Sequence, residues 1–114
     1  MDAKLFNIVS IVNEGFSDKV IEICKENGAG GGTVIPANSG ITKDSMLLYG
    51  IGVHPEKEIV LVVVKPEYVE PIMSKLYDKL GTGSEAMGIF FTLPVTHASD
   101  NLLNQKRLEK EEIK

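Results

Sequence analysis

The chain has 114 residues, a mass of 12.4 kDa and a formal charge of −4 at pH 7, and 43% of its residues are apolar and 25% charged. This length suits a single domain, and these fractions exclude a wholly disordered chain. No apolar run reaches the roughly 18 residues of a membrane-spanning helix. The acidic balance argues against a protein that follows nucleic-acid phosphates. We expect a small domain with no nucleic-acid partner and no membrane insertion.

Two features of the sequence bear on its compartment. Residues 1–4 lack both a basic region and a small-residue cleavage site, so we expect no secretory signal. Cys24 is the single cysteine and cannot form an internal disulfide, which is typical of a reducing compartment. The expected localisation is therefore cytoplasmic.

The N-terminal part predicts a strand followed by a helix. Residues 5–12 are rich in Ile and Val and predict a strand. Residues 17–27 predict a short helix, with Ser17 as the expected N-cap residue. Phe16 and Ile21 fit a hydrophobic staple around that cap, and the Asn-Gly pair after residue 26 is a typical helix end.

The next part predicts a strand and a long connection. Residues 33–36 predict a second strand that is entered through the glycine-rich residues 28–32. Residues 37–45 have the composition of a loop. Residues 46–53 are apolar but broken by two glycines, which leaves either a strand or an ordered part of a longer loop.

The C-terminal part predicts a strand, a helix and a last strand. Residues 59–64 have the strongest strand pattern in the chain. Apolar residues at helical spacing predict a helix that begins near 68–70 and ends before Gly81. Residues 81–88 predict a loop, and residues 89–93 predict the last strand, which ends at a proline.

The element order β-α-β-β-α-β predicts an α+β fold of the ferredoxin-like type, with two helices on one face of an antiparallel sheet. We expect this domain to cover residues 1–102. Residues 103–114 alternate Lys, Arg and Glu and are expected to form a charged C-terminal tail.

Two of the predicted strands conflict with a sheet that faces water on one side. Such strands should alternate apolar and polar residues, but residues 59–64 are apolar on both faces and residues 89–93 nearly so. The second face therefore needs a cover, and in a chain of this length another copy is the expected cover. The pattern predicts a homo-oligomer.

Two glycine-rich segments are candidates for ligand contact. Residues 28–32 follow a helix and precede a strand, the reverse of the order in a dinucleotide-binding fingerprint, so they are either a flexible turn or backbone that approaches a ligand beside Thr33. Residues 81–88 lack the Gly-Lys-Ser/Thr of a P-loop. They form either a plain connector or a nest of N–H groups for an anion.

No catalytic constellation or metal site is apparent. The two histidines, His54 and His97, have no cysteine or carboxylate at a metal-like spacing, and Cys24 lies on the apolar stripe of the first predicted helix. None of the 16 acidic residues stands out as a general acid or base. We therefore expect no catalytic residue and no metal ligand.

Three segments resemble the nitrogen-regulatory P-II signalling proteins and their P-II-like relatives. The segments are Gly28-Ala-Gly-Gly-Gly-Thr-Val-Ile35, Glu58-Ile-Val-Leu-Val-Val-Val-Lys-Pro66 and Met87-Gly-Ile-Phe-Phe-Thr-Leu-Pro-Val95. The resemblance covers about residues 4–96. It implies a homotrimer whose sheets pack together at the centre, a small-molecule effector such as an adenine nucleotide in clefts between subunits, and no enzymatic activity. It also implies regulation of a target protein in nitrogen metabolism through residues 37–55.

The resemblance also implies the residues of each site. The implied ligand-binding residues are Gly31, Gly32, Thr33, Lys65, Gly81, Thr82, Gly83, Ser84 and Gly88. The implied contacts to the target protein are Ser39, Lys43 and Tyr49. No cofactor is implied beyond the nucleotide.

Two alternatives remain open at this point. The chain also resembles the CutA-type divalent-cation tolerance proteins, which share the trimeric architecture, and metal binding would then involve His54, His97 or Cys24. The other alternative is a small dimeric enzyme of ferredoxin-like fold with a His or Asp base in an open cleft.

Overall fold

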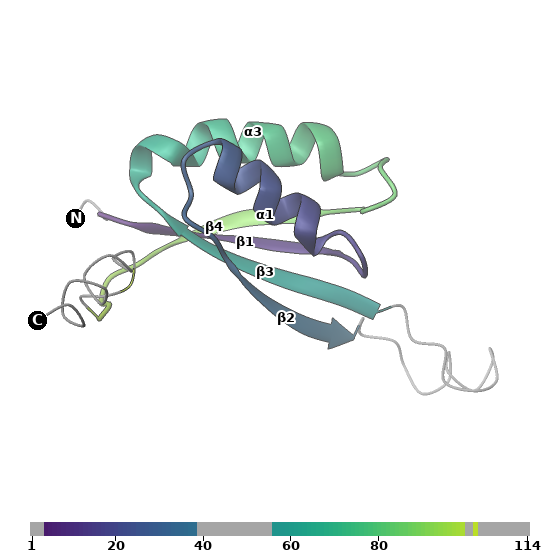
Figure 1. Ribbon diagram of the computed structural model, residues 1–114, viewed down its shortest axis with the longest axis horizontal. Helices are drawn as coiled ribbons and strands as arrows, with labels where there is room; N and C mark the ends of the chain where they lie inside the picture. The colour runs from purple at the N-terminus through teal and green to yellow at the C-terminus, as the bar shows by residue number, and fades with distance from the viewer. Residues whose placement is uncertain (1–3, 39–55, 100–101, 103–114) are drawn as a thin grey trace, which may run out of the picture.

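The computed structural model describes residues 4–38, 56–99 and 102. It has two helices on one face of a four-stranded antiparallel sheet with strand order β2-β3-β1-β4 (Figure 1). The elements in chain order are β1 (Phe6–Asn13), α1 (Ser17–Glu26), β2 (Thr33–Asn38), β3 (Glu56–Val64), the 3-10 helix η1 (Pro66–Tyr68), α3 (Val69–Leu80) and β4 (Ile89–Pro94). The predicted α+β, ferredoxin-like fold is confirmed.

The element bounds differ most from the prediction at β3. This strand begins at Glu56, three residues before the predicted start, because Glu56, Lys57 and Glu58 pair with β2 on one side and the last two also pair with the end of β1 on the other. The prediction was based on apolar residues and therefore did not include the three charged residues at this end of the strand. The segment 46–53 and the tail 103–114 lie outside the described residues, so the division at residue 102 stays a prediction.

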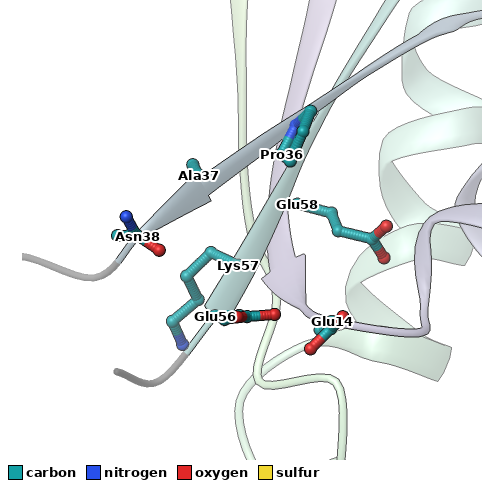
Figure 2. Close-up of a pocket in the computed structure, with 7 residues that line it drawn as sticks. All are labelled: Glu14, Pro36, Ala37, Asn38, Glu56, Lys57 and Glu58. Carbon is teal, nitrogen blue, oxygen red and sulfur yellow. The ribbon is translucent and has the colours of Figure 1, made fainter. Parts of the chain in front are cut away.

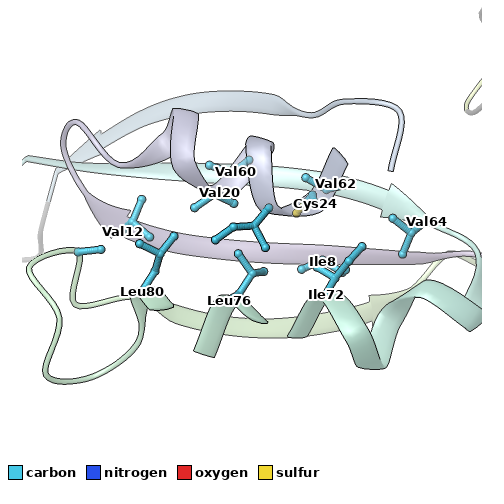
Figure 3. Close-up of a cluster of buried hydrophobic side chains, with 12 residues drawn as sticks. Ile8, Val12, Val20, Cys24, Val60, Val62, Val64, Ile72, Leu76 and Leu80 are labelled. Carbon is cyan, nitrogen blue, oxygen red and sulfur yellow. The ribbon is translucent and has the colours of Figure 1, made fainter. Parts of the chain in front are cut away.

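The core lies between the sheet and the helices (Figure 3). Alternate residues of β1 and β3 point to the helices, and the apolar ones among them are buried except Phe6, which is half-buried. Every third or fourth residue of each helix meets them. The fully buried apolar side chains are Ile8, Val12, Val20, Cys24, Val60, Val62, Ile72, Leu76 and Ala86.

The start of α1 corrects one prediction. The N-cap residue is Phe16, not Ser17, and neither provides a side-chain cap; Ser17 is the first residue of the helix. The capping group comes from β3 instead, because a Glu58 carboxylate oxygen accepts hydrogen bonds from the backbone N–H of Gly15 at 2.8 Å and of Ser17 at 3.3 Å. A carboxylate is favourable there because the unpaired N–H groups and the positive end of the helix dipole lie at the N-terminus of a helix.

The predicted start of the second helix is confirmed. Pro66 occupies the first turn of η1, where no intrahelical N–H is needed, and α3 continues from Val69. Pro71 also lies in the first turn of α3. Neither proline therefore removes a helical hydrogen bond.

The face of the sheet opposite the helices is apolar and carries no covering element among the described residues (Figure 1). The strand registers place on it Val9, Ile11, Ile35, Ile59, Leu61, Val63, Ile89, Phe91 and Leu93. We call these nine side chains the open apolar face. The exposed fraction is 60% for Ile89, 49% for Leu93 and 41% for Phe91, which is unusual for a monomer in water.

None of the helices in the described ranges is long and apolar enough to cross a bilayer.

Candidate ligand site

The 81–88 loop joins α3 to β4 and is closed by its own hydrogen bonds. The amide of Ser84 donates to Gly81 O at 3.1 Å, that of Met87 to Ser84 O at 3.2 Å, and that of Gly88 to Leu80 O at 2.7 Å. The Ser84 hydroxyl also donates to Gly81 O at 2.7 Å. These three amides point into the loop, so an anion would have to use the other amides of the segment.

Two residues at the end of this loop have unusual backbone surroundings. A Cβ on Gly88 would lie 2.4 Å from the Phe90 ring and 2.5 Å from Leu80 O, so only glycine fits there. Met87 has a φ of 46°, a left-handed conformation that is uncommon outside glycine, asparagine and aspartate. Residues 87 and 88 therefore give the end of the loop a defined backbone conformation.

The second group of predicted ligand residues lies along β2 and at the end of β3. Gly32 packs closely against β3, since a Cβ there would lie 2.8 Å from Val62 Cγ2. Thr33 is exposed and pairs with Leu61. Lys65 is exposed and follows directly on the last residue of β3. The absence of a side chain at Gly32 thus allows this segment to pack closely against β3.

One chain does not bring the two groups together. The 81–88 loop contacts the C-terminal end of β1, where Asn13 N donates to Ala86 O at 2.9 Å. Lys65 lies at the opposite end, because Val64 pairs with Phe6, and seven residue steps along β1 span about 23 Å. Thr33 is about 13 Å from the loop end along the strands, and its strand β2 lies two strands away from β1. A single site made of both groups requires two chains.

A polar junction at the loop end was missed by the sequence analysis. Asn13 Nδ2 donates to Glu85 O at 2.9 Å, and Lys57 Nζ donates to Asn13 Oδ1 at 2.6 Å. Glu14 N donates to Glu56 O at 3.2 Å in the same place. Asn13 thus touches both the 81–88 loop and the first residues of β3. The sequence gives little indication of this junction, because Asn13 and Glu14 after a predicted strand indicate only a turn.

A small hollow of about 220 Å³ adjoins this junction (Figure 2). Three carboxylates line it, from Glu14, Glu56 and Glu58, and the remaining lining comes from Lys57 and the last residues of β2, Pro36, Ala37 and Asn38. Glutamates at 56 and 58 share one face of β3 because side chains alternate along a strand. The hollow is therefore predominantly acidic.

The crowding of carboxylates affects the pKa of one of them. A hydrogen bond to Glu56, repulsion from Glu56, some desolvation and repulsion from Glu58 together raise the pKa of Glu14 above its ordinary value of 4.5. Glu58 is held in place by the two N–H groups at the start of α1. The hollow consequently repels anions at neutral pH.

The predicted contacts to a target protein, Ser39, Lys43 and Tyr49, lie outside the described residues, as does His54. The hollow nevertheless marks where the chain leaves β2 at Asn38 and re-enters the sheet at Glu56.

Two residues of the metal alternative, Cys24 and His97, lie in the described part of the chain, and their surroundings differ. Cys24 is buried in the core, where desolvation raises the pKa of its thiol to about 11, and His97 is exposed beyond β4. Across residues 4–38, 56–99 and 102, no group of three His, Cys, Asp or Glu side chains could hold a metal ion.

Comparisons with known proteins identify the fold. No protein-family model matches the chain, and no curated protein sequence is significantly similar to it. Among solved structures, the PII protein of Arabidopsis thaliana bound to citrate aligns with a TM-score of 0.64 and 22% identity, over 90% of this chain and 86% of that one.

Two bacterial structures also align with most of this chain. The GlnK–ATP complex of B. subtilis aligns with a TM-score of 0.62 and 18% identity, over 84% of this chain and 85% of that one. A protein of Thermus thermophilus described as PII-like aligns with a TM-score of 0.55 and 20% identity, over 83% of this chain and 92% of that one. The chain has the fold of the P-II signalling proteins, as its sequence motifs led us to expect.

Proposed function

We propose that this chain is a P-II-like regulatory protein rather than an enzyme. In this proposal it assembles as a cytoplasmic homotrimer, senses a small molecule in clefts between subunits, and regulates a target protein through the segment between Asn38 and Glu56. A role in nitrogen metabolism is part of the proposal, on the strength of the P-II fold. The main support for this proposal is the open apolar face on a chain with the P-II fold.

The open apolar face supports the assembly. Its side chains come from all four strands, and Ile89, Phe91 and Leu93 form an exposed stripe along the edge strand β4. Exposed apolar area of this kind is removed from water when sheets pack face to face. Additional copies of the same chain provide a matching apolar surface, and a closed ring covers every copy equally.

The positions of the predicted ligand residues support a cleft between subunits. Gly31, Gly32, Thr33 and Lys65 lie toward one end of the sheet, and the loop with Gly81, Thr82, Gly83, Ser84 and Gly88 lies at the other. Two copies that pack through their sheets can place one group beside the other. The proposed site therefore takes the first group from one subunit and the loop from its neighbour.

The charges at these positions restrict the proposed ligand. The solved relatives were crystallised with anions, ATP for B. subtilis GlnK and citrate for A. thaliana PII. In this chain Lys65 is the single cation among the proposed ligand residues, and Glu85 adds a negative charge within the loop. Phosphates rely on charge-assisted hydrogen bonds, so we propose an adenine nucleotide or related molecule with few phosphate charges.

Isothermal titration calorimetry tests this proposal. We expect AMP or a cyclic dinucleotide to bind more tightly than ADP, and ADP more tightly than ATP, with citrate as a further anion for comparison. Lys65→Met should weaken nucleotide binding about tenfold, the loss of one charge-assisted contact. Lys75→Met, a change at an exposed lysine of α3, should leave it unchanged. Absence of heat with every nucleotide would contradict the nucleotide form of the proposal.

A further inference from the structure

We infer that Asn13 is a positioning residue that couples the conformation of the 81–88 loop to the start of β3, through hydrogen bonds to Glu85 and Lys57. Asn13 is the last residue of β1 and lies between the two segments in space. Its side chain bonds one segment with its nitrogen and the other with its oxygen. In sequence, these partners lie 72 and 44 residues away.

Both polar atoms of the Asn13 side chain form a hydrogen bond. Nδ2 donates to Glu85 O at 2.9 Å, and Oδ1 accepts from Lys57 Nζ at 2.6 Å. The backbone N–H of the same residue donates to Ala86 O at 2.9 Å. A charged donor makes the bond from Lys57 stronger than a neutral one. Two hydrogen bonds thus connect Asn13 to the loop, and one side-chain hydrogen bond connects it to Lys57 of β3.

The planarity of the amide group links these bonds. The nitrogen and oxygen of one amide are fixed relative to each other, so rotation about the side-chain bonds moves both. If the loop carries the carbonyls of Glu85 and Ala86 away from β1, Nδ2 must follow or lose its bond. If Nδ2 follows, Oδ1 moves relative to Lys57; if the bond breaks, the amide loses one of the two bonds that fix its orientation toward Lys57. A displacement of the loop therefore alters the interaction at the start of β3.

The start of β3 has a second connection to this place. Glu14 N donates to Glu56 O at 3.2 Å, so Asn13 and the residue after it hold both Lys57 and Glu56. Glu56 is where the chain enters β3 from the segment that follows Asn38. In the proposed regulator, this junction relays a change at the 81–88 loop to that entry point. The regulatory meaning rests on the proposed function, whereas the coupling itself does not.

Hydrogen–deuterium exchange of the full chain, without ligand, tests the coupling. The reporters are the amides of Met87 and Gly88, which are protected by bonds within the loop. Lys57→Met removes a side chain whose hydrogen bond goes to Asn13 and not to the loop itself. We expect it to raise the exchange rate of both reporters about fivefold, with core amides of α3 unchanged. Lys75→Met is the matched control and should change neither.

A double variant makes the test specific to Asn13. Asn13→Ala alone should raise the exchange rate of both reporters, because it removes the bond to Glu85. In the Asn13→Ala background, Lys57→Met should have no further effect, because the connection is already lost. Additive effects, an unchanged loop in Lys57→Met, or equal acceleration of the α3 core amides would each overturn the inference. None of these outcomes depends on a trimer or on nucleotide binding, so they are separate from a failure of the proposed function.

Discussion

At the scale of single residues, Ser10 is the least satisfied side chain of the core. It is fully buried on the helix-facing side of β1, and its Oγ has no hydrogen-bond partner in the described part of the chain. Burial of an unpaired hydroxyl costs free energy. Its neighbours across the strands are Val60 and Phe90, both apolar.

Replacement of this serine by alanine should therefore stabilise the protein. We expect Ser10→Ala to raise the free energy of unfolding by about 1 kcal/mol, measured by denaturant titration at fixed protein concentration. Ser84→Ala is the matched control and should lower it, because the Ser84 hydroxyl donates to Gly81 O at 2.7 Å. A loss of stability in Ser10→Ala would mean that the hydroxyl has a partner.

Glu14 gives a second prediction, on pH dependence. Its pKa is raised in the folded chain, so the protonated form is favoured by folding. The stabilising contribution is present below the unfolded value of 4.5 and is lost as the pH rises through the folded pKa. At neutral pH the charged side chain therefore opposes folding.

The corresponding variant is Glu14→Gln, which removes the charge at every pH. Its melting temperature should exceed that of the wild type at pH 7, and the difference should shrink as the pH falls towards 4.5. Glu22→Gln, at an exposed position of α1, provides a comparison outside the carboxylate cluster. An equal difference for Glu14→Gln at pH 7 and pH 4.5 would refute the explanation by crowded carboxylates.

At the scale of elements, α1 depends on a side chain that is distant in sequence. Glu58 of β3 accepts hydrogen bonds from the N–H groups of Gly15 and Ser17, about 40 residues earlier in the chain. We expect Glu58→Ala to lower the free energy of unfolding by about 1–2 kcal/mol and Glu58→Gln by less, since glutamine keeps an acceptor oxygen. The check is denaturant unfolding monitored by far-ultraviolet circular dichroism; equal losses would contradict the role of the acceptor.

Local patterns were sufficient to predict the described helices and strands. The apolar spacing and the glycine after each helix identified α1 and α3, and Val-rich runs identified β1 and the apolar part of β3. These signals lie within one segment. The α+β order then followed from the succession of elements.

Contacts between distant segments were not predictable in the same way. The cap of α1 was assigned to Ser17 because that residue precedes a helical pattern, whereas the structure uses Glu58. The junction at Asn13 combines Lys57 and Glu85, and no local pattern connects three residues so far apart. The start of β3 was missed because its charged residues line the hollow rather than the core.

At the scale of the whole molecule, the open apolar face is the basis of the proposed assembly. Phe91 lies on that face beside Val9, with 41% of its surface exposed. Phe91→Lys would place a charge inside the proposed interface, where burial without a partner is costly. We expect this variant to dissociate into monomers of 12.4 kDa, as measured by light scattering after size-exclusion chromatography.

A control variant separates this effect from a general change in surface charge. Tyr77 is 71% exposed on α3, on the side of the sheet away from the open apolar face. Tyr77→Lys should leave the mass of the assembly unchanged. Dissociation in both variants would contradict an interface located on the sheet.

In the proposed trimer, the sheet of this P-II-like chain is buried between three copies. The most direct measurement is the solution mass of the wild-type protein by sedimentation equilibrium over a range of concentrations. Three chains of 12.4 kDa predict a mass of about 37 kDa that does not change on dilution through the micromolar range. A mass of 12.4 kDa at every concentration would show a monomer and would contradict the proposed trimer.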